Sequence, residues 1–432
     1  MAEQFHYKGG LINGKVKVPG DKSISHRAVM LASIADGETV IDRFLHSEDC
    51  RRTIEAFKSL GVHISENGEQ VKVLGKGVNS LRQPNTTLDM GNSGTTTRLL
   101  IGLLSALPFN THLNGDESLI NRPMGRVLNP LTEMGAQFFP MKDENKLPLQ
   151  VKGGQLQPIT YRLPVDSAQV KSSILLAGLL TNGTTTVIEN NPTRDHTEKM
   201  LSAFGGSVEV DGQHIKVSGK QSLKSTNITV PGDQSSAAFW IAVAVITPGS
   251  HLILEEVGVN STRMGLVNVL KRMGANINVS VERYIGDEPV GTIEVAYSEL
   301  IPTTITEQEI PSMVDEIPLL ALIATQTKGE MKINHIKELR YKETDRIEAT
   351  VSILQNLGAT VFSSEDQIVV KGPTQLKGGS VQSENDHRMA MMAVIASIIS
   401  DEPVTIDETD CINVSYPTFF EDMRLIMKEI EL

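Results

Sequence analysis

The hexapeptide VPGDKS occupies Val18–Ser23, and VPGDQS returns at Val230–Ser235, with Lys22 replaced by Gln234. In each copy an apolar residue is followed by Pro, which fixes the backbone φ angle, and by Gly, which allows a wide range of backbone angles. Asp follows at the position expected for a helix N-cap. Each copy therefore predicts a strand-to-helix turn. Two such turns half a chain apart indicate a duplicated architecture in which one copy retains a positive charge.

Length and composition predict a soluble globular protein of two to four domains. The chain has 432 residues, of which 40% are hydrophobic and 21% charged. A net charge of −12 and few aromatic residues argue against a nucleic-acid partner. Cys50 and Cys411 form no disulfide or metal motif, and no signal peptide or membrane-length apolar stretch is present. We expect a cytoplasmic protein without a membrane partner.

A polar helix-start signal recurs six times, which predicts a repeated module. The six residues are Asp21, Asn92, Asp166, Asp233, Asp315 and Asp386, separated by 67 to 82 residues. After each of the first five signals, an amphipathic run ends at a glycine that predicts a left-handed helix C′ residue. These glycines are Gly61, Gly135, Gly205, Gly274 and Gly358. Hairpin signals follow two of them, at Asn67-Gly68 and Asp211-Gly212.

The sixth module begins at Asp386, but the chain ends before its second half. We therefore expect the strands in residues 1–19 to complete it. The modules then form two domains of three modules each, one covering residues 20–229 and the other covering 1–19 plus 230–432. The two VPGD turns would be the hinge crossovers, near residues 19–21 and 230–233.

Cationic side chains gather near the expected helix starts in this acidic protein. They are Lys22, Arg27, Arg98, Lys171, Lys342, Arg346 and Arg388, with Arg122, Arg126 and Arg194 on linking segments. Helix N-termini also attract anions through their free N–H groups and dipole. The pattern predicts a small phosphate- or carboxylate-bearing ligand enclosed between the domains. The alternative is a set of surface ion pairs.

Four further motifs allow both a chemical and a structural interpretation. LRYKETDR (339–346) and NDHRMAMM (385–392) are either ion-paired helices or, with Asp315, a source of acid–base groups. DSAQVKS (166–172) offers a hydroxyl and an amide to a substrate, or a plain N-cap. LHSEDC (45–50) lacks the spacing of a metal site, so we expect a cap or surface segment there and no metal.

Eight ordered motifs carry a family resemblance. They are VPGDKSISHRA, GNSGTTTR, NRPMGRV, DSAQVKSS, TRDHTEKM, VDEIPLLA, LRYKETDRI and NDHRMAM, between Lys15 and about Phe420. Together they resemble the signatures of the 5-enolpyruvylshikimate-3-phosphate synthase family. The resemblance implies an α/β fold, a two-domain inside-out α/β barrel of six βαβαββ repeats, three per domain. The implied reaction moves the enolpyruvyl group of phosphoenolpyruvate to the 5-hydroxyl of shikimate 3-phosphate and releases phosphate, without metal or organic cofactor.

The resemblance also implies a role for individual residues. Shikimate 3-phosphate would be held by Lys22, Ser23, Arg27, Ser167, Gln169, Arg194, Asp315 and Lys342. Phosphoenolpyruvate would be held by Lys22, Gly94, Arg122, Gln169, Arg346 and Arg388. Asp315, Glu343 and Lys22 would be catalytic, with Asp315 taking the hydroxyl proton and Glu343, beside Lys342, handling the proton at the enol carbon. We expect a monomer.

The chain departs from the family pattern at two positions. Ala168 stands where many members have a second serine, so one substrate hydrogen bond is expected to be missing. Val414 stands where a lysine is common, so another group must balance that charge. GDKS, SAQVK, RDHTE (194–198) and NSTR (260–263) resemble the glyphosate-tolerant class II branch, which predicts reduced glyphosate sensitivity.

The sequence disfavours three rival functions. UDP-N-acetylglucosamine enolpyruvyl transferase uses a cysteine shortly before an arginine of an ARP motif, and NGDESLINRP (114–123) has none. An RNA 3′-phosphate cyclase would need a basic face. A catalytically silent metabolite-binding protein would have lost its acid–base groups, whereas Asp315, Glu343 and Lys22 all remain.

Overall fold

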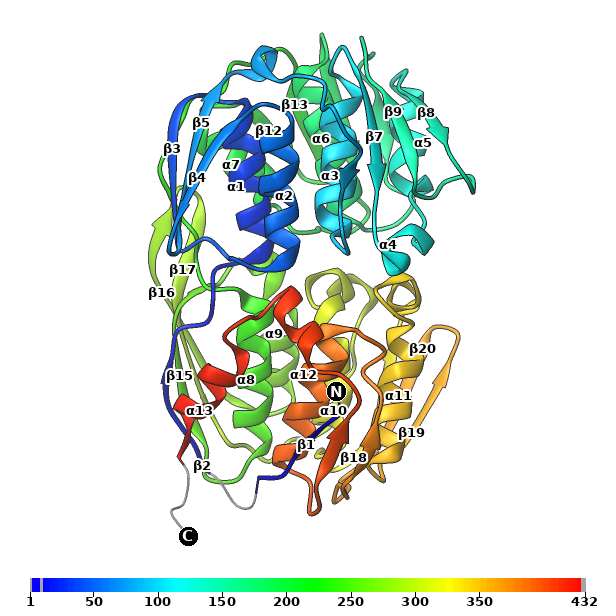
Figure 1. The fold of residues 1–432 in the computed structure, drawn as a ribbon. Coiled ribbons are helices and arrows are strands. Elements are labelled where there is room, and N and C mark those ends of the chain that lie inside the picture. Colours follow the sequence, from blue (N-terminus) through cyan, green and yellow to red (C-terminus); the bar gives the residue numbers. More distant parts are fainter. Residues whose placement is uncertain (1, 8–10, 429–432) are drawn as a thin grey trace. The chain divides into compact units, whose positions relative to one another are not determined.

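The computed structural model describes residues 2–7 and 11–428, and the chain divides into two compact units (Figure 1). The first unit comprises Gly20–Val230 and Tyr284–Glu288, and the second comprises Met1–Pro19, Pro231–Arg283 and Pro289–Leu432. The chain passes between units inside both VPGD turns. The segment Tyr284–Glu288 differs from the sequence prediction, which places it in the domain that contains residues 230–432.

The first unit contains three four-stranded sheets with one common strand order. The orders are β14(Ile228–Thr229)-β3(Asp36–Asp42)-β5(Gln70–Lys76)-β4(His63–Asn67), β6(Leu88–Asp89)-β7(Asn110–Asn114)-β9(Leu149–Lys152)-β8(Gln137–Pro140), and β10(Thr160–Arg162)-β11(Thr184–Ile188)-β13(His214–Ser218)-β12(Val208–Asp211). In each sheet the first two strands are parallel and the last two form an antiparallel hairpin. The recurrence confirms the repeated module.

Helices of two kinds accompany these sheets. Three are buried along almost their whole length, namely α1 (Lys22–Ile34), α3 (Gly94–Ser105) and α6 (Ala168–Leu180). Three amphipathic helices precede the hairpins, namely α2 (Glu48–Ser59), α5 (Gly125–Glu133) and α7 (His196–Ala203), and α4 (Glu117–Asn121) is short. A helix that is apolar on all sides must lie in a core. Helices therefore fill the interior of this unit and the sheets lie outside them.

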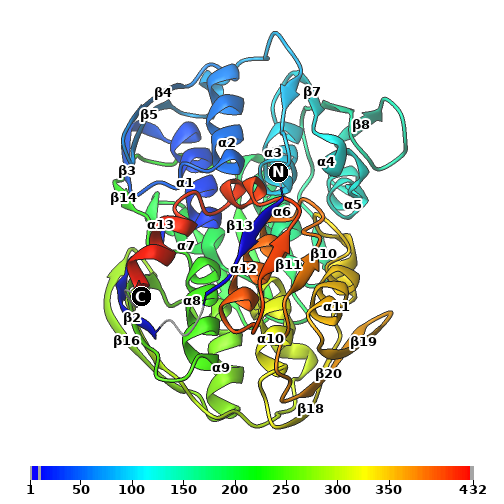
Figure 2. The same cartoon turned by 60° about the horizontal axis from the view of Figure 1, so that its bottom comes forward.

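The second unit repeats this plan with irregular sheets. Their orders are β16(Asn276–Ile285)-β17(Glu288–Ala296)-β15(His251–Gly258)-β2(Leu11–Val16)-β23(Met427–Lys428), β18(Gly329–Asn334)-β20(Gln367–Gly372)-β19(Thr360–Ser364), and β1(Glu3–Phe5)-β22(Val404–Ile406)-β21(Gly379–Val381). The buried helices are α8 (Gln234–Ile246), α10 (Ile317–Ala324) and α12 (His387–Ile398), which lie inside the strands (Figure 2). The outer helices are α9 (Gly265–Arg272), α11 (Arg346–Asn356) and α13 (Phe419–Ile426).

The N-terminal strand completes the sixth module, as predicted. Strand β1 pairs antiparallel with β22, which is parallel to β21. Strand β2 serves a different module, since it pairs in parallel with β15. The N-terminal segment thus supplies strands to two sheets of the second unit.

Local signals locate the helix ends closely. Asp21, Asp233 and Asp386 are the N-caps of α1, α8 and α12, as predicted. The helix-stop glycines all have positive φ, between 78° and 103°, at Gly61, Gly135, Gly205, Gly274 and Gly358. The caps of α3 and α6 are Ser93 and Ser167, one residue after the predicted Asn92 and Asp166. Asp315 instead lies in the 3₁₀ turn Val314–Glu316 before α10.

Among the described residues, no helix has the length and apolar character needed to cross a bilayer.

Candidate functional site

Lys22 and Arg27 lie in the first two turns of α1, and carboxyl and hydroxyl groups of neighbouring helices hold them. Asp21 caps the helix by accepting the N–H of Ile24. Lys22 Nζ lies 3.0 Å from Asp49 Oδ2 of α2, and both side chains are mostly buried. Asp49 belongs to the LHSEDC segment, where Ser47 caps α2. The expectation of a cap is therefore confirmed, whereas a surface position is wrong for Asp49, which is buried.

Arg27 is a buried cation held by three hydrogen bonds. Its Nε donates to Thr197 Oγ1 at 2.7 Å and its Nη2 to Ser172 Oγ at 2.7 Å. Its Nη1 donates to the carbonyl of Ser23 at 3.0 Å. Burial lowers the pKa of Arg27 to about 10, against the opposing effect of Glu198 and Asp21. Arg27 therefore remains charged at neutral pH.

The N-terminus of α3 gathers two further arginines. Arg122 Nη2 donates to the side-chain oxygen of Asn92 and to Ser118 Oγ. A β-carbon placed on Gly94 would lie 3.1 Å from Arg122 Nη1 and 3.7 Å from Arg98 Nη1. Guanidinium groups, free helix N–H groups and a residue without a side chain together favour a bound oxyanion. Arg126 lies half-buried on α5.

The resemblance assigns Gly94 to phosphoenolpyruvate, so Gly94→Ala is expected to raise the KM for this substrate about 10-fold, because the new methyl group must displace the Arg122 guanidinium by a few tenths of an ångström. Steady-state kinetics with each substrate varied in turn measure the effect. Gly154→Ala is the matched control, since a β-carbon there meets no atom within 4 Å. Equal KM values for both variants would contradict the predicted role of Gly94.

Gln169 connects α6 to Arg98 and Thr95 of α3. Its Oε1 accepts from Arg98 Nη1 at 2.6 Å, and its Nε2 donates to Thr95 Oγ1 at 3.0 Å. Ser167 caps α6 by accepting the N–H of Val170, which leaves its hydroxyl proton to donate elsewhere. Ala168 follows directly as the first helical residue. Both interpretations of DSAQVKS are thus compatible, since a capping residue and a half-buried amide lie two positions apart.

Lys171 differs from the expectation that it lines an anion site. Its side chain is 1% exposed and lies 2.6 Å from Glu198 Oε1 and 3.0 Å from Glu189 Oε1. Burial alone would lower the pKa of Lys171, but the two carboxylates raise it above its ordinary value. The charge is satisfied inside the protein. Arg194, half-buried on the same segment as these carboxylates, lies close enough to influence Arg27 electrostatically.

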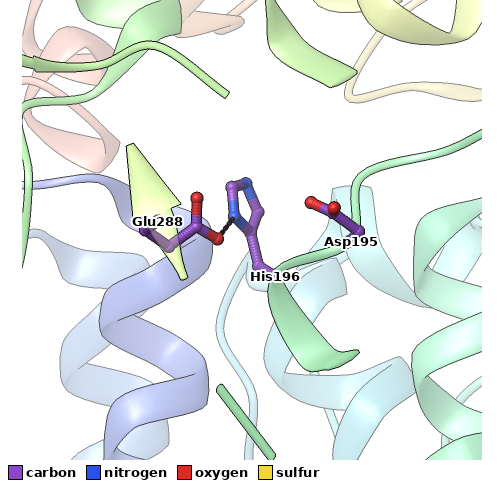
Figure 3. A group of neighbouring side chains, drawn as sticks. All are labelled: Asp195, His196 and Glu288. Atoms are coloured by element: carbon purple, nitrogen blue, oxygen red, sulfur yellow. Dashed lines mark hydrogen bonds and ion pairs between the residues drawn. The ribbon is translucent and has the colours of Figure 1, made fainter. Parts of the chain in front are cut away.

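Asp195, His196 and Glu288 form a compact group whose ligand atoms lie within 4.8 Å of one another (Figure 3). His196 Nδ1 and Glu288 Oε1 are 2.6 Å apart, and Asp195 Oδ2 lies 2.8 Å from Lys199 Nζ. Figure 3 shows the two carboxylates on opposite sides of the imidazole ring. The contact between His196 and Glu288 ties α7 to the segment Tyr284–Glu288.

The predicted acid–base residues lie together in the second unit. Lys342 Nζ donates to Asp315 Oδ1 at 3.1 Å, and Arg346 Nη1 lies 3.4 Å from the same oxygen. Arg346 Nη2 also donates to Glu343 Oε2 at 2.6 Å. Asp315 and Glu343 therefore share one guanidinium group. Their side chains are 13% and 20% exposed, which leaves both within reach of a small ligand.

Arg346 is more deeply enclosed than the sequence suggests. It is 1% exposed, and its Nε and Nη2 contact the two oxygens of Asp386 at 2.8 and 3.2 Å. Burial opposes its charge, yet Asp386, Glu343 and Asp315 raise its pKa above the ordinary value. Arg388 donates from Nη1 to the carbonyl of Asp315 at 3.2 Å and lies 3.4 Å from Glu316 Oε1.

The two groups of side chains differ in electrostatic character. In the second unit three cations, Lys342, Arg346 and Arg388, contact four carboxylates, Asp315, Glu316, Glu343 and Asp386. In the first unit, Arg27 of α1, Arg98 of α3 and Arg122 after α4 bond to hydroxyl, amide and carbonyl oxygens. The first unit is therefore suited to binding anions, and the second to moving protons.

Several members of these groups carry no distinctive sequence signal. Asp49, Thr197, Glu316 and Asp386 hold the predicted cations, but in the sequence they resemble ordinary caps and helix residues. In the duplicate turn VPGDQS, the position of Lys22 is taken by Gln234, which is 2% exposed. Arg263 contacts the adjacent Asp233 and Ser235 at 3.1 and 2.7 Å. Val414 ends the 3₁₀ turn Asp410–Val414.

Comparison with known proteins identifies the family. A family model described as EPSP synthase (3-phosphoshikimate 1-carboxyvinyltransferase) matches residues 7–423. The 3-phosphoshikimate 1-carboxyvinyltransferase of Oceanobacillus iheyensis is 49% identical over 97% of this chain and 98% of its own. That of Geobacillus kaustophilus is 48% identical over 96% and 98%.

Solved structures agree with this result. An EPSP synthase from Acinetobacter baumannii has a TM-score of 0.87 and 41% identity, covering 99% of this chain and 98% of its own. The enolpyruvyl transferase NikO from Streptomyces tendae has a TM-score of 0.78 at 18% identity, over 98% and 96%, and shares the fold. These similarities confirm the enolpyruvyl transferase-like α/β fold. The chain belongs to the EPSP synthase family.

Proposed function

We propose that this protein transfers the enolpyruvyl group of phosphoenolpyruvate to the 5-hydroxyl of shikimate 3-phosphate and releases inorganic phosphate. The observation that carries the proposal is the Asp315–Lys342–Arg346–Glu343 cluster, which combines two accessible carboxylates with cations. The arginine-rich first unit supplies the complementary requirement, since both substrates are polyanions. The reaction belongs to the shikimate pathway, which leads to chorismate and the aromatic amino acids.

Shikimate 3-phosphate is assigned to the cations and polar groups of α1, α6 and the segment before α7, together with Asp315 and Lys342 of the second unit. Its proposed ligands are Lys22, Ser23, Arg27, Ser167, Gln169, Arg194, Asp315 and Lys342. Arg27 is rigidly bonded to its neighbours, so it supplies a fixed positive field. Ser167 and Gln169 add hydroxyl and amide donors at the start of α6.

Phosphoenolpyruvate is assigned to Lys22, Gly94, Arg122, Gln169, Arg346 and Arg388. Gly94 and Arg122 are adjacent, and bidentate arginine contacts suit both the phosphate and the carboxylate of this substrate. Arg346 is bonded to three carboxylates, so substrate competes with them for its N–H groups. Glu343 is the most exposed of the three carboxylates, so we expect substrate to displace this contact first.

The chemistry proceeds by addition and elimination. Asp315 accepts the proton of the 5-hydroxyl while the oxygen of that hydroxyl attacks C2 of phosphoenolpyruvate. Glu343, beside Lys342, delivers a proton to C3. In the second step a C3 proton returns to the enzyme and the C2–O bond to phosphate breaks, so the double bond reforms and phosphate departs. The two steps require opposite proton movements at C3, which a carboxyl group within reach of water and cations can provide. Arginines stabilise the phosphate and carboxylate charges throughout.

The competing enolpyruvyl transferase that uses a catalytic cysteine is disfavoured by the thiols of this chain. Cys50 and Cys411 are both buried. Burial raises the pKa of Cys411 to about 12 and raises that of Cys50 further. Neither thiol has the thiolate character that catalysis requires. A silent binding protein is disfavoured because the proposed acid–base residues lie together.

A coupled phosphate-release assay tests the function. With both substrates the protein should release phosphate at a steady rate, and omission of either shikimate 3-phosphate or phosphoenolpyruvate should abolish release. Release that proceeds with UDP-N-acetylglucosamine in place of shikimate 3-phosphate would favour the rival transferase. We further propose that the enzyme acts as a cytoplasmic monomer without cofactor, metal or nucleic acid.

Shikimate 3-phosphate is expected to compact the molecule, because residues of both units are assigned to it and closure would exclude water from the charged ligand. Small-angle X-ray scattering should show a smaller radius of gyration with the substrate than without it. Shikimate, which lacks the phosphate, is the control ligand at equal concentration. An unchanged profile with shikimate 3-phosphate would contradict closure.

Reduced sensitivity to glyphosate is expected from the class II motifs. The relevant motifs include SAQVK, which opens α6, and NSTR, whose Arg263 contacts the cap of α8. Inhibition measured against varied phosphoenolpyruvate should give a high inhibition constant relative to KM. Inhibition as tight as in the sensitive branch, with an EPSP synthase of that branch assayed in parallel, would refute the assignment.

A further inference from the structure

Lys171 is a buried, fully bonded cation that the proposed reaction does not use. Its ammonium group has three donor protons and three acceptors. These are Glu198 Oε1 at 2.6 Å, Glu189 Oε1 at 3.0 Å and the carbonyl of Thr193 at 3.4 Å. With 1% of its side chain exposed, Lys171 cannot reach a substrate. Its partners, however, lie on either side of Arg194.

On the N-terminal side of Arg194, the network holds Thr193 through all of its polar groups. The Thr193 N–H donates to Glu189 Oε1 at 3.2 Å, and the Thr193 hydroxyl donates to the same oxygen. Lys171 Nζ donates to the Thr193 carbonyl. Glu189 is buried at the end of β11, and burial raises its pKa. Lys171 thus supplies the positive charge that keeps this carboxylate ionised and in place.

On the C-terminal side, Glu198 belongs to α7 and is bonded to Lys171. Its neighbour Thr197 accepts from Arg27 Nε at 2.7 Å and shares a 2.7 Å hydrogen bond with Ser172 Oγ. Lys171 and Ser172 are consecutive on α6, as Thr197 and Glu198 are on α7. Two links therefore join α6 to α7, one through an ion pair and one through hydroxyl groups. Arg27 donates hydrogen bonds to both hydroxyl groups of the second link.

We propose that Lys171 is a positioning residue for shikimate 3-phosphate, acting through Arg27 and Arg194 without touching the substrate. The proposal rests on the assignment of these two arginines to that substrate. A buried ion triad is a poor way to gain stability, because apolar residues of similar volume stabilise a core as well or better. It is a good way to hold two arginines at fixed positions. The three charged groups leave one net negative charge beside Arg27, which favours its charged form.

Lys171→Met tests the proposal by removing the charge while keeping most of the side-chain length. We expect the KM for shikimate 3-phosphate to rise about 10-fold or more, while the KM for phosphoenolpyruvate changes less than about 3-fold. Titration calorimetry should show the same loss in shikimate 3-phosphate affinity without the second substrate. A purely structural role would lower the melting temperature and leave this affinity unchanged.

The double variant Lys171→Met/Glu198→Gln separates positioning from charge balance, because it restores the net charge of the wild-type triad. It should recover melting temperature relative to Lys171→Met but keep the raised KM. Val217→Ala is the stability control, since Val217 packs near Gly178 at the far end of α6. It should lower the melting temperature without changing either KM.

Three results would overturn the proposal. These are a wild-type KM for shikimate 3-phosphate in Lys171→Met, recovery of KM in the double variant, and an equal rise in KM in Val217→Ala. If Lys171→Met alone does not fold, the double variant decides by the same KM criterion. Failure of the proposed function is distinguishable, because the unsubstituted protein would then release no phosphate.

Discussion

Lys22→Met is expected to lower kcat/KM by about 10²- to 10⁴-fold. Lys22 is assigned to both substrates, and each charge-assisted contact contributes about 1.5–3 kcal/mol, so loss of two contacts costs about 3–6 kcal/mol of transition-state stabilisation. The variant also leaves Asp49, which is 7% exposed, without its 3.0 Å ion-pair partner. Steady-state phosphate release, together with a melting curve to confirm folding, measures the effect.

The internal duplication provides a matched control for this prediction. Gln234 occupies the position of Lys22 in the second VPGD turn, and Asp233 caps α8 as Asp21 caps α1. Gln234→Met introduces the same side chain at the equivalent helix start and should leave turnover near normal. Near-normal activity of Lys22→Met, or equal losses in the two variants, would overturn the assignment of Lys22.

Asp315→Ala is expected to lower kcat by about 10²- to 10⁴-fold, the usual contribution of a positioned general base. Shikimate 3-phosphate affinity should change much less, because the cations assigned to that substrate in the first unit remain. Removal of the carboxylate also frees Lys342 from its 3.1 Å contact, which leaves a cation for the substrate. Turnover kinetics and calorimetric titration of shikimate 3-phosphate measure the two effects separately.

Glu348→Ala is the control for Asp315→Ala. Glu348 is an exposed carboxylate in the first turn of α11, with Arg340 as its ion-pair partner. Its loss should leave both kcat and affinity unchanged. If Asp315→Ala weakens binding strongly while kcat is preserved, Asp315 is a binding residue and the hydroxyl proton is taken by another group.

The sequence predicts the repeated fold well because its signals are local. A helix that ends in the left-handed region needs a glycine, so the five stop glycines are visible from short windows. The predicted caps of α3 and α6 are wrong by one residue, because two neighbouring polar residues compete for each cap. Ser167 takes the cap of α6, while Asp166 accepts hydrogen bonds from the backbone and side chain of Asn191.

The sequence predicts less about which charges are satisfied. In the sequence, Lys171 resembles a ligand-binding cation. In the fold, Glu189 directly after β11 and Glu198 of α7 form ion pairs with it. The same holds for Arg346, whose partner Asp386 comes from a different module. These pairings depend on tertiary packing between segments distant in sequence, and no local pattern encodes them. The location of Tyr284–Glu288 in the first unit depends on such packing as well.

The proposed function requires that cations of both units bind one pair of anionic substrates. A crystal structure with shikimate 3-phosphate and a non-reactive phosphoenolpyruvate analogue tests it most directly. We predict that nitrogen atoms of Lys22, Arg122, Arg346 and Arg388 lie within about 3.2 Å of oxygens of the bound ligands. Ligands that contact residues of one unit alone, with the other arginines still bonded to their present carboxylates, would contradict it.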